Sequence, residues 1–303
     1  MKYIDWLNSW LENYIRPSVR DRTYERYAYI IEQHIRPIGG IGLNDLSLLV
    51  LQRFITGLLS AGNRRTGKGL SANSVNTVIS VIRNSLKTAH LLGLTAEYTA
   101  DKLKRPKRKE KPVDCFTLAE QKKIEQAVIT GKKDKLYGII LCLYSGLRIG
   151  ELIALEWHDI DFTKGILTVS KSCHDGKNGL IIDEPKTANS RRVIPLPKQL
   201  LPMLKGLKKK SDSPFVVSSN GKAVSVRSYQ RSFELLLKRL NIAHKGFHSL
   251  RHTFATRAIE CGMDVKTLSE ILGHKNPTVT LNRYAHSLME HKAEMMNRLG
   301  KLL

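Results

Sequence analysis

The spacing of hydrophobic residues predicts that the first part of the chain is helical. In residues 1–101, apolar side chains recur every three or four positions, as they do on the buried face of an α-helix. Ile4, Leu7 and Leu11 begin this pattern near the N-terminus. Three further helices are predicted over residues 23–35, over residues 47–61 and from residue 71 onward.

The second part of the chain combines helix and strand patterns. Thr117 and Glu120 have the spacing of a capping box, which predicts the start of a helix. From Ser225 onward the pattern is helical again. Short runs rich in branched residues predict strands at 166–169, 179–182 and 192–196. The predicted fold is therefore mainly α with a small antiparallel β-sheet, in the α+β class, and Lys186 is placed on a hairpin turn between the last two strands.

A basic segment separates the two parts. Seven of the eleven residues from 102 to 112 are Lys or Arg, and two prolines prevent a continuous helix. We therefore expect two domains, residues 1–101 and 113–303, joined by an extended, self-repelling linker. A linker that lies along a phosphate backbone and one that only adds solubility are both consistent with this composition.

The charge of the chain favours a polyanionic partner. The formal net charge is +23, and cationic side chains that contact phosphates release condensed counterions. The alternative explanation of this charge is a basic protein that has no nucleic-acid role. In that case the polar face of the helix after residue 71 would simply be solvated. The candidate DNA contacts are the basic residues of the linker and the polar residues of the helix after residue 71, namely Lys104, Arg105, Lys107, Arg108, Asn73, Asn76 and Arg83.

The cysteines and the apolar runs indicate a reducing compartment and no membrane partner. The four cysteines are widely scattered, form no Cys-x-x-Cys pair and follow no secretory segment. No apolar run approaches the roughly 18 residues that a membrane-spanning helix needs. We therefore expect a reduced cytoplasmic protein.

An ordered set of side chains in the second part fits chemistry on a phosphodiester. The guanidinium groups of Arg148 and Arg251 can hold the non-bridging oxygens of a phosphate in a bidentate fork. The imidazoles of His248 and His274 can move protons or donate hydrogen bonds. The phenol of Tyr284 can attack phosphorus if a base or a positive field activates it, because its ordinary pKa is near 10.

Each of these residues has a structural explanation when taken alone. Lys186 can act as a general acid, but it is one lysine among many. Arg148 can simply form an ion pair with Glu151 on one helix. His248 and His252 lie four residues apart, as in some zinc sites, yet no Glu follows the first histidine and no third ligand is evident. We therefore predict no metal and no cofactor.

Three segments together resemble the motifs of the tyrosine recombinases, the phage-integrase family. They are residues 145–152 (SGLRIGEL), residues 248–256 (HSLRHTFAT) and residues 272–286 (LGHKNPTVTLNRYAH). The helical first part is similar in length and pattern to the core-binding domain of that family. The resemblance implies a helical, SAM-like core-binding domain and a mixed α/β catalytic domain.

The resemblance also implies a reaction. Tyr284 would attack the scissile phosphate, form a 3′-phosphotyrosyl bond and free a 5′-hydroxyl. Arg148, Arg251 and His274 would stabilise the charge on five-coordinate phosphorus, and Lys186 would protonate the leaving oxygen. A 5′-hydroxyl from a partner strand then reverses the chemistry. The phosphotyrosine retains the bond energy, so neither ATP nor a metal ion is required.

Further roles follow from the same resemblance. His248 would assist proton transfer at the tyrosine, Glu151 would orient the Arg148 segment, and His252 would support the site without reacting. Two strand exchanges through a Holliday junction need four protomers, so we expect a homotetramer on double-stranded DNA. A C-terminal helix over residues 288–303 would dock either on a neighbouring protomer or on its own domain. Accessory DNA-bending or directionality proteins are further partners that the resemblance suggests.

The expected biological role is integration or excision of a mobile element by a bacterial or phage-encoded enzyme at the nucleoid. Many integrases of phages and conjugative transposons have an additional N-terminal domain that binds distant arm sites. This chain starts directly at the expected core-binding helices, so we expect a shorter recombinase or one from which that domain was removed.

Two other functions share part of this pattern. A type IB topoisomerase also uses a tyrosine nucleophile, but that family usually has Lys at the position of His248. A non-catalytic DNA-binding regulator would be expected to lack some of the six catalytic residue types, and none is missing here.

Overall fold

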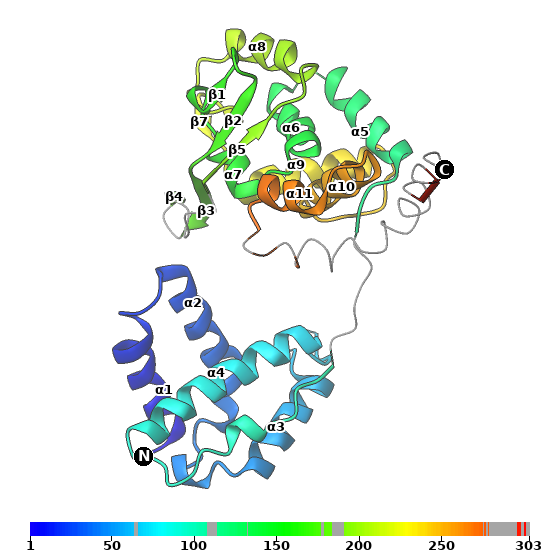
Figure 1. Ribbon diagram of the computed structural model, residues 1–303. Helices are drawn as coiled ribbons and strands as arrows, with labels where there is room; N and C mark the ends of the chain where they lie inside the picture. The colour runs from blue at the N-terminus through cyan, green and yellow to red at the C-terminus, as the bar shows by residue number, and fades with distance from the viewer. Residues whose placement is uncertain are drawn as a thin grey trace. The chain divides into compact units, whose positions relative to one another are not determined.

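The chain folds into two compact units, Met1–Lys111 and Pro112–Leu303. The computed structural model in Figure 1 describes residues 1–63, 66–107, 114–131, 133–176, 179–183, 191–274, 276, 278, 296, 297 and 300.

The first unit is helical, as predicted. Ser47 and Ser71 cap the third and fourth helices: their hydroxyl oxygens accept hydrogen bonds from the amides of Val50 at 3.3 Å and Ser74 at 3.1 Å. The α-helices are α1 (Tyr3–Trp10), α2 (Asp21–Ile30), α3 (Leu48–Ala61) and α4 (Ala72–Leu91). Single π-helical turns extend α1 over Leu11–Ile15 and α2 over Ile31–Ile35, and 3₁₀ turns occupy Arg36–Ile38, Leu43–Asp45 and Ala100–Lys102.

Helix α4 lies at the centre of the core of this unit. It buries Val75, Ile79 and Ile82 on one face. Two aromatic residues of α1 contact Ser85 on the same helix: the Tyr3 hydroxyl lies 2.9 Å from its hydroxyl oxygen, and the indole of Trp6 donates to its carbonyl at 3.0 Å. These bonds satisfy buried polar groups and fix α1 against α4.

The first half of the predicted linker packs on α4. Leu103 is buried in the core of the first unit. Arg83 donates to the carbonyls of Ala100 at 2.9 Å and Leu103 at 2.8 Å, and the Asn76 amide donates to the carbonyl of Pro106 at 3.1 Å. Leu103 and Pro106 therefore attach the start of the expected linker to the first unit, and its extended, self-repelling state stays a prediction. The first compact unit continues past the boundary expected at residue 101.

The second unit starts with the predicted capping box. The Thr117 amide donates to the Glu120 carboxylate at 2.8 Å, and the Glu120 amide donates to the Thr117 hydroxyl at 3.2 Å. The helices are α5 (Leu118–Ile129), α6 (Tyr137–Ser145), α7 (Ile149–Ile153), α8 (Leu200–Lys210), α9 (Val226–Arg239), α10 (His248–Glu260) and α11 (Val265–Leu272), with 3₁₀ turns at Asp134–Leu136 and Trp157–Asp159.

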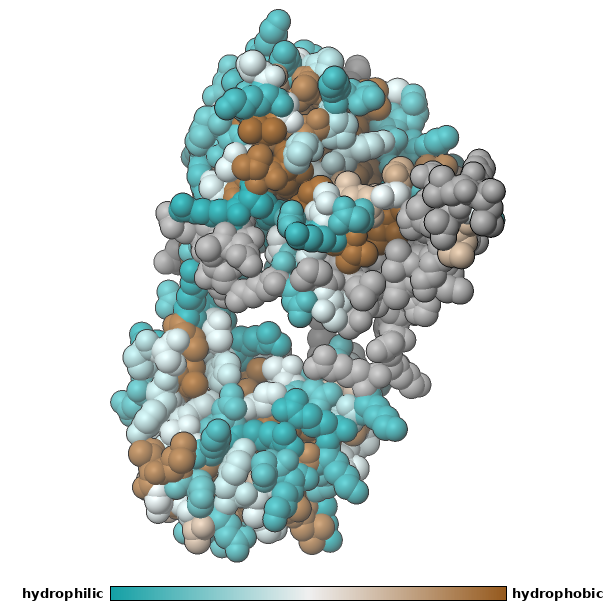
Figure 2. All heavy atoms as spheres, in the orientation of Figure 1, coloured by the Kyte–Doolittle hydropathy of each residue, from teal (hydrophilic) through white to brown (hydrophobic). Residues whose placement is uncertain are grey.

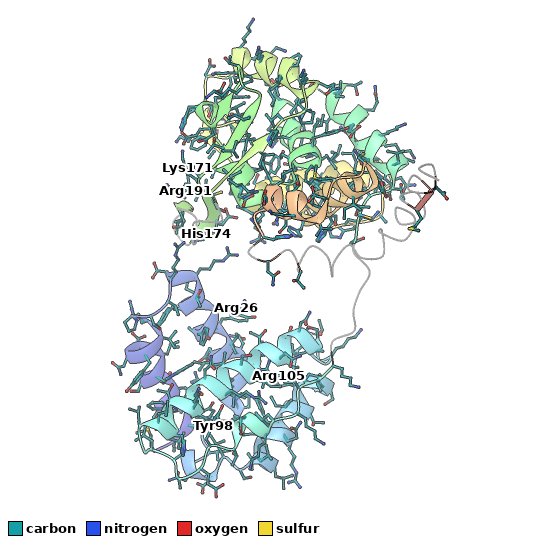
Figure 3. The ribbon with its side chains drawn as sticks, viewed as in Figure 1. Arg26, Tyr98, Arg105, Lys171, His174 and Arg191 are labelled. Carbon is teal, nitrogen blue, oxygen red and sulfur yellow. The ribbon has the colours of Figure 1, made fainter. Side chains whose placement is uncertain are left out.

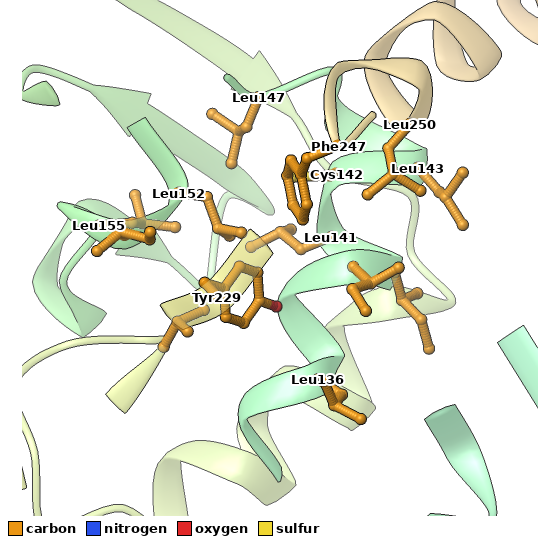
Figure 4. Close-up of a cluster of buried hydrophobic side chains, with 14 of the residues drawn as sticks. Leu136, Leu141, Cys142, Leu143, Leu147, Leu152, Leu155, Tyr229, Phe247 and Leu250 are labelled. Atoms are coloured by element: carbon orange, nitrogen blue, oxygen red, sulfur yellow. The ribbon is translucent and has the colours of Figure 1, made fainter. Parts of the chain in front are cut away.

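Helix α6 is enclosed by the rest of the second unit. It is apolar on all sides, and Leu141 and Cys142 on it are completely buried. Around it lie Leu152 of α7, Tyr229 of α9 and Phe247 at the start of α10 (Figure 4). This packing holds the C-terminal end of α6, where the predicted Arg148 segment begins, in a fixed place.

The small antiparallel sheets differ in pairing from the prediction. The strands are β1 (Ile160–Asp161), β2 (Ile166–Val169), β3 (Ser172–Gly176), β4 (Gly179–Asp183), β5 (Arg192–Pro195), β6 (Ser218–Ser219) and β7 (Lys222–Ala223). Strand β4 pairs with β3, and β5 pairs with β2 in the order β1-β2-β5. The predicted hairpin between β4 and β5 is therefore wrong. Lys186, in the segment that connects them, lies outside the described residues.

On the face shown in Figure 2, hydrophilic residues predominate, and hydrophobic residues form a larger patch on the second unit and smaller ones on the first. In the described part of the chain, no helix is both long and apolar enough to span a bilayer.

Candidate active site

Arg148 is placed by the turn between α6 and α7. Gly146 ends α6 in the left-handed conformation, with φ of 65°, and Arg148 is the residue before the first turn of α7. Glu151, in that turn, accepts hydrogen bonds from the Arg148 amide at 2.9 Å and from its guanidinium at 2.7 Å. The contact between Arg148 and Glu151 that the sequence suggested is present.

Glu151 is a buried, ionised carboxylate. Burial alone raises its pKa, but Arg192 donates to both of its oxygens, at 3.0 and 2.8 Å. The charges of Arg192 and Arg148 and these hydrogen bonds lower the pKa of Glu151 to about 2. The carboxylate is therefore negative at any physiological pH.

Arg251 and His274 meet at the end of α11. Arg251 is 2% exposed and donates to the carbonyls of Gly146 at 2.7 Å and Leu272 at 2.6 Å. One of its terminal nitrogens lies 3.0 Å from the Nε2 atom of His274. Gly273, with φ of 66°, ends α11 and directs the chain into His274.

Arg148 reaches the same turn. Its second terminal nitrogen lies 3.4 Å from the carbonyl oxygen of Gly273. Arg148, Arg251 and His274, which are up to 126 residues apart in sequence, thus surround one turn. The arrangement places two guanidinium groups and an imidazole where they can surround one anion.

His248 and His252 lie one turn apart at the start of α10. Their rings are in edge-to-face contact, with centroids 4.6 Å apart. Within the described ranges, no three His, Cys, Asp or Glu side chains are grouped as metal ligands.

Several predicted residues fall beyond the described part of the chain. Like Lys186, the residues Tyr284 and Arg108 lie outside the described residues. The predicted C-terminal helix over residues 288–303 does too, apart from residues 296, 297 and 300. Four of the predicted DNA contacts lie on the first unit and are exposed, namely Lys104, Arg105, Lys107 and Asn73. Asn76 and Arg83 contact the backbone of residues 100–106, a structural role that the sequence analysis missed; their DNA contacts stay predictions.

Sequence reasoning also missed Arg192. It lies on β5 and is buried, and its Nε atom donates to the carbonyl of Ile271 at 2.6 Å. Because side chains alternate along a strand, Arg192 shares the inward face with Ile194. The sequence contained one signal for this residue: Arg192 occupies a strand position whose alternation with Ile194 predicts that it faces inward.

A second group of basic residues lies at and beside the β3–β4 hairpin. Lys171, His174 and Arg191 gather near it in Figure 3. Asp175 attaches the hairpin to α9, because its carboxylate accepts from the amides of Val226 at 2.9 Å and Arg227 at 2.8 Å. The hairpin is thereby held at the N-terminus of α9.

Comparison with known proteins identifies the family. The phage integrase family model matches residues 116–291, and the model of the phage integrase N-terminal SAM-like domain matches residues 3–59. The chain belongs to the phage integrase family. It is a tyrosine recombinase, an enzyme that cleaves and rejoins DNA, as the motifs indicated.

Curated relatives include recombinases and a transposase. A XerC-like tyrosine recombinase of Caldanaerobacter subterraneus is 27% identical, over 98% of this chain and 82% of the relative. The tyrosine recombinase XerA of Pyrococcus furiosus is 31% identical, over 78% of this chain and 77% of the relative. The Tn916 transposase of Enterococcus faecalis is 30% identical, over 61% of this chain and 51% of the relative.

Solved structures confirm the predicted fold class. The Tn1549 transposon integrase in complex with a circular intermediate DNA aligns with a TM-score of 0.81 at 25% identity, covering 99% of both chains. A lambda integrase dimer bound to a COC′ core site aligns with a TM-score of 0.72 at 20% identity, covering 94% of this chain and 77% of lambda integrase. The second match concerns the fold alone.

Proposed function

We propose that this chain is a site-specific DNA recombinase that integrates or excises a mobile element through a 3′-phosphotyrosine intermediate and a Holliday junction. The observation that supports the proposal is the convergence of Arg148, Arg251 and His274 on the turn at Gly273. The mobile-element role is supported by the relatives, which include a Tn916 transposase and a Tn1549 transposon integrase.

The three side chains would stabilise the phosphorane. Attack on a phosphodiester concentrates negative charge on the non-bridging oxygens, and fixed cationic donors stabilise that charge without reorganising. Arg251 is fixed by two backbone carbonyls and Arg148 by the Glu151 carboxylate. His274 would donate to the same oxygens.

Tyr284 would be the nucleophile. It follows His274 by ten residues in sequence, and the two arginines would supply the positive field that lowers the cost of forming a phenolate. Lys186 would protonate the leaving 5′-oxygen, and His248 would assist proton transfer at the tyrosine. Glu151 would hold Arg148, and His252 would support His248 through their ring contact.

The proposed substrate is double-stranded DNA in the cytoplasm, and the proposed assembly is a homotetramer. The net charge of +23 and the exposed Lys104, Arg105 and Lys107 favour contacts with phosphates. Two sequential strand exchanges require four active sites. A lambda integrase tetramer bound to a Holliday junction has the same fold. Docking of the C-terminal helix on a neighbour and binding of accessory bending or directionality proteins belong to the same proposal.

The decisive experiment uses Tyr284→Phe on a nicked suicide substrate carrying the recombination site. We expect covalent protein–DNA adducts with the wild type and none with the variant, because Phe has no oxygen to attack phosphorus. The DNA dissociation constant should stay within about twofold, because one hydroxyl contributes little to a phosphate-dominated interface. Adducts formed by the Phe variant would refute Tyr284 as nucleophile. Efficient relaxation of a plasmid without the site would favour a topoisomerase instead.

A further inference from the structure

Arg192 connects two parts of the proposed active site that are distant in sequence. Its two terminal nitrogens donate to Glu151 of α7, at 3.0 and 2.8 Å. Its Nε atom donates to the carbonyl of Ile271 in the last turn of α11, at 2.6 Å. One planar side chain therefore binds the helix that begins after Arg148 and the helix that ends before His274.

The carboxylate that Arg192 holds is the same one that holds Arg148. Each Glu151 oxygen accepts from both arginines: Oε1 from the two guanidiniums, and Oε2 from Arg192 and the Arg148 amide. A carboxylate bound on one side by a fixed fork has little freedom to rotate. Its remaining acceptor directions then determine where the Arg148 guanidinium points.

The turn that presents His274 is shaped around Arg192. A Cβ atom on Gly273 would lie 3.1 Å from Cδ and Nη1 of Arg192, so the glycine backbone and the guanidinium pack closely. Gly273 also adopts the left-handed conformation that favours glycine. The Arg192 side chain therefore limits the positions available to this turn and to the His274 ring after it.

Arg192 uses all three of its guanidinium nitrogens inside the protein, so we assign it no contact with a phosphate. Its side chain is 6% exposed, whereas that of Arg148 is 38% exposed. Its hydrogen bonds to Glu151 and Ile271 are directed into the protein. Any effect of Arg192 on the reaction must therefore pass through Arg148 and His274.

We propose that Arg192 is a positioning residue for cleavage, which aims Arg148 through Glu151 and fixes the α11 turn that presents His274. This inference rests on the proposed roles of Arg148 and His274. It predicts an effect on the rate of the chemical step that exceeds any effect on DNA affinity, because the Arg192 nitrogens donate to Glu151 and Ile271 inside the protein.

The test compares Arg192→Lys and Arg192→Met with the wild type. The readouts are adduct formation at saturating enzyme in a single turnover, the DNA dissociation constant and the thermal unfolding midpoint. We expect Arg192→Met to cleave about 100-fold more slowly, the cost of misplacing a catalytic group by about 1 Å. Arg192→Lys keeps the charge but cannot form three bonds in one plane, so we expect a rate about 10-fold lower at nearly unchanged affinity.

A surface arginine provides the matched control. Arg231 also pairs with a glutamate, Glu234, but at 3.8 Å and with its side chain 72% exposed. Arg231→Met removes the same charge from the same unit, and we expect its cleavage rate and affinity to stay within about twofold of the wild type, because exposed pairs contribute little.

The outcomes separate the inference from the function on which it rests. If the wild type forms no adduct through Tyr284, the proposed function fails. If the wild type reacts and a folded Arg192→Lys variant reacts equally fast, only the positioning role is overturned. Loss of affinity in proportion to rate, or unfolding of both Arg192 variants, would likewise overturn it and leave Arg192 a purely structural residue.

Discussion

A buried carboxylate is costly unless cations surround it, and Glu151 shows how the site meets this requirement. At 5% exposure an unpaired Glu would take up a proton instead of remaining charged. Two arginines, from β5 and from the start of α7, keep Glu151 ionised. Removal of either arginine side chain would take hydrogen-bond donors away from a buried carboxylate, so the three side chains function as one unit.

The low pKa of Glu151 predicts a specific dependence of stability on pH. Its pKa is about 2 in the folded chain against an ordinary 4.5, so its stabilising contribution is present above about pH 4.5 and disappears as the pH falls towards 2. The wild type should lose about 3 kcal/mol of unfolding free energy relative to Glu151→Gln across this range. Urea unfolding of both proteins at several pH values measures it. A constant difference between them would show that Glu151 does not titrate in this way.

Residue-level prediction from sequence succeeded where partners are close in the chain. Arg148 and Glu151 are three residues apart, so helix geometry alone brings them together. Arg192 is 41 residues from Glu151, and the pattern gave only an arginine in a strand. No local rule indicates that such a buried cation has a partner on another element.

At the scale of elements, helix starts were predictable and short strands were not. Ser71 and Thr117 cap helices through their own hydroxyls, which is a local property of the sequence. Strand β3 (Ser172–Gly176) has no run of branched residues, and its partner β4 leaves Ile181 and Ile182 about 45% and 41% exposed. Hydrophobicity therefore gave no signal for this pairing, and the apolar β4 was assigned to the wrong neighbour.

The turn after α6 gives a prediction at the same scale. A Cβ atom on Gly146 would lie 2.6 Å from Phe254 and 2.8 Å from Leu272, in a left-handed backbone that disfavours other residues. Gly146→Ala should therefore lower the unfolding free energy by about 2 kcal/mol or more. It should also slow cleavage, since the Gly146 carbonyl anchors Arg251.

The control for Gly146→Ala is a glycine inside a helix. Gly206 on α8 has open space where a Cβ would be placed, so Gly206→Ala should raise the unfolding free energy by about 0.5 to 1 kcal/mol. Urea unfolding measures both variants. Equal effects of the two substitutions would contradict the role assigned to the left-handed turn.

At the scale of the whole molecule, the chain length and the basic segment indicated two domains, and the net charge indicated a polyanionic partner. Each unit has its own buried cluster, one around α4 and one around α6. The net charge of +23 showed that a polyanion was a suitable partner but gave no location for it. The family motifs, and not the charge, identified the chemistry, because charge is a sum over the chain and a site depends on geometry.

The basic segment after α4 predicts a change in the salt dependence of DNA binding. If Lys104, Arg105 and Lys107 each neutralise one phosphate, replacing all three by Ala should reduce the slope of log affinity against log salt by about 0.9 per phosphate, or roughly 2.7 in total. Fluorescence anisotropy at salt concentrations from about 50 to about 200 mM measures the slope. Replacing Lys208, Lys209 and Lys210 at the end of α8 removes the same charge. If both triple variants change the slope equally, the segment binds no phosphate of its own.

Three of the groups that anchor Arg251 and Arg192 are main-chain carbonyls, at positions 146, 271 and 272. A substitution changes a side chain and leaves the carbonyl in place, so a mutational scan cannot delete these bonds one by one. A scan of this site would rate Ile271 and Leu272 as ordinary packing positions. Their contribution to the chemistry would become visible only through backbone changes, such as an ester in place of the peptide bond, which weaken the acceptor itself.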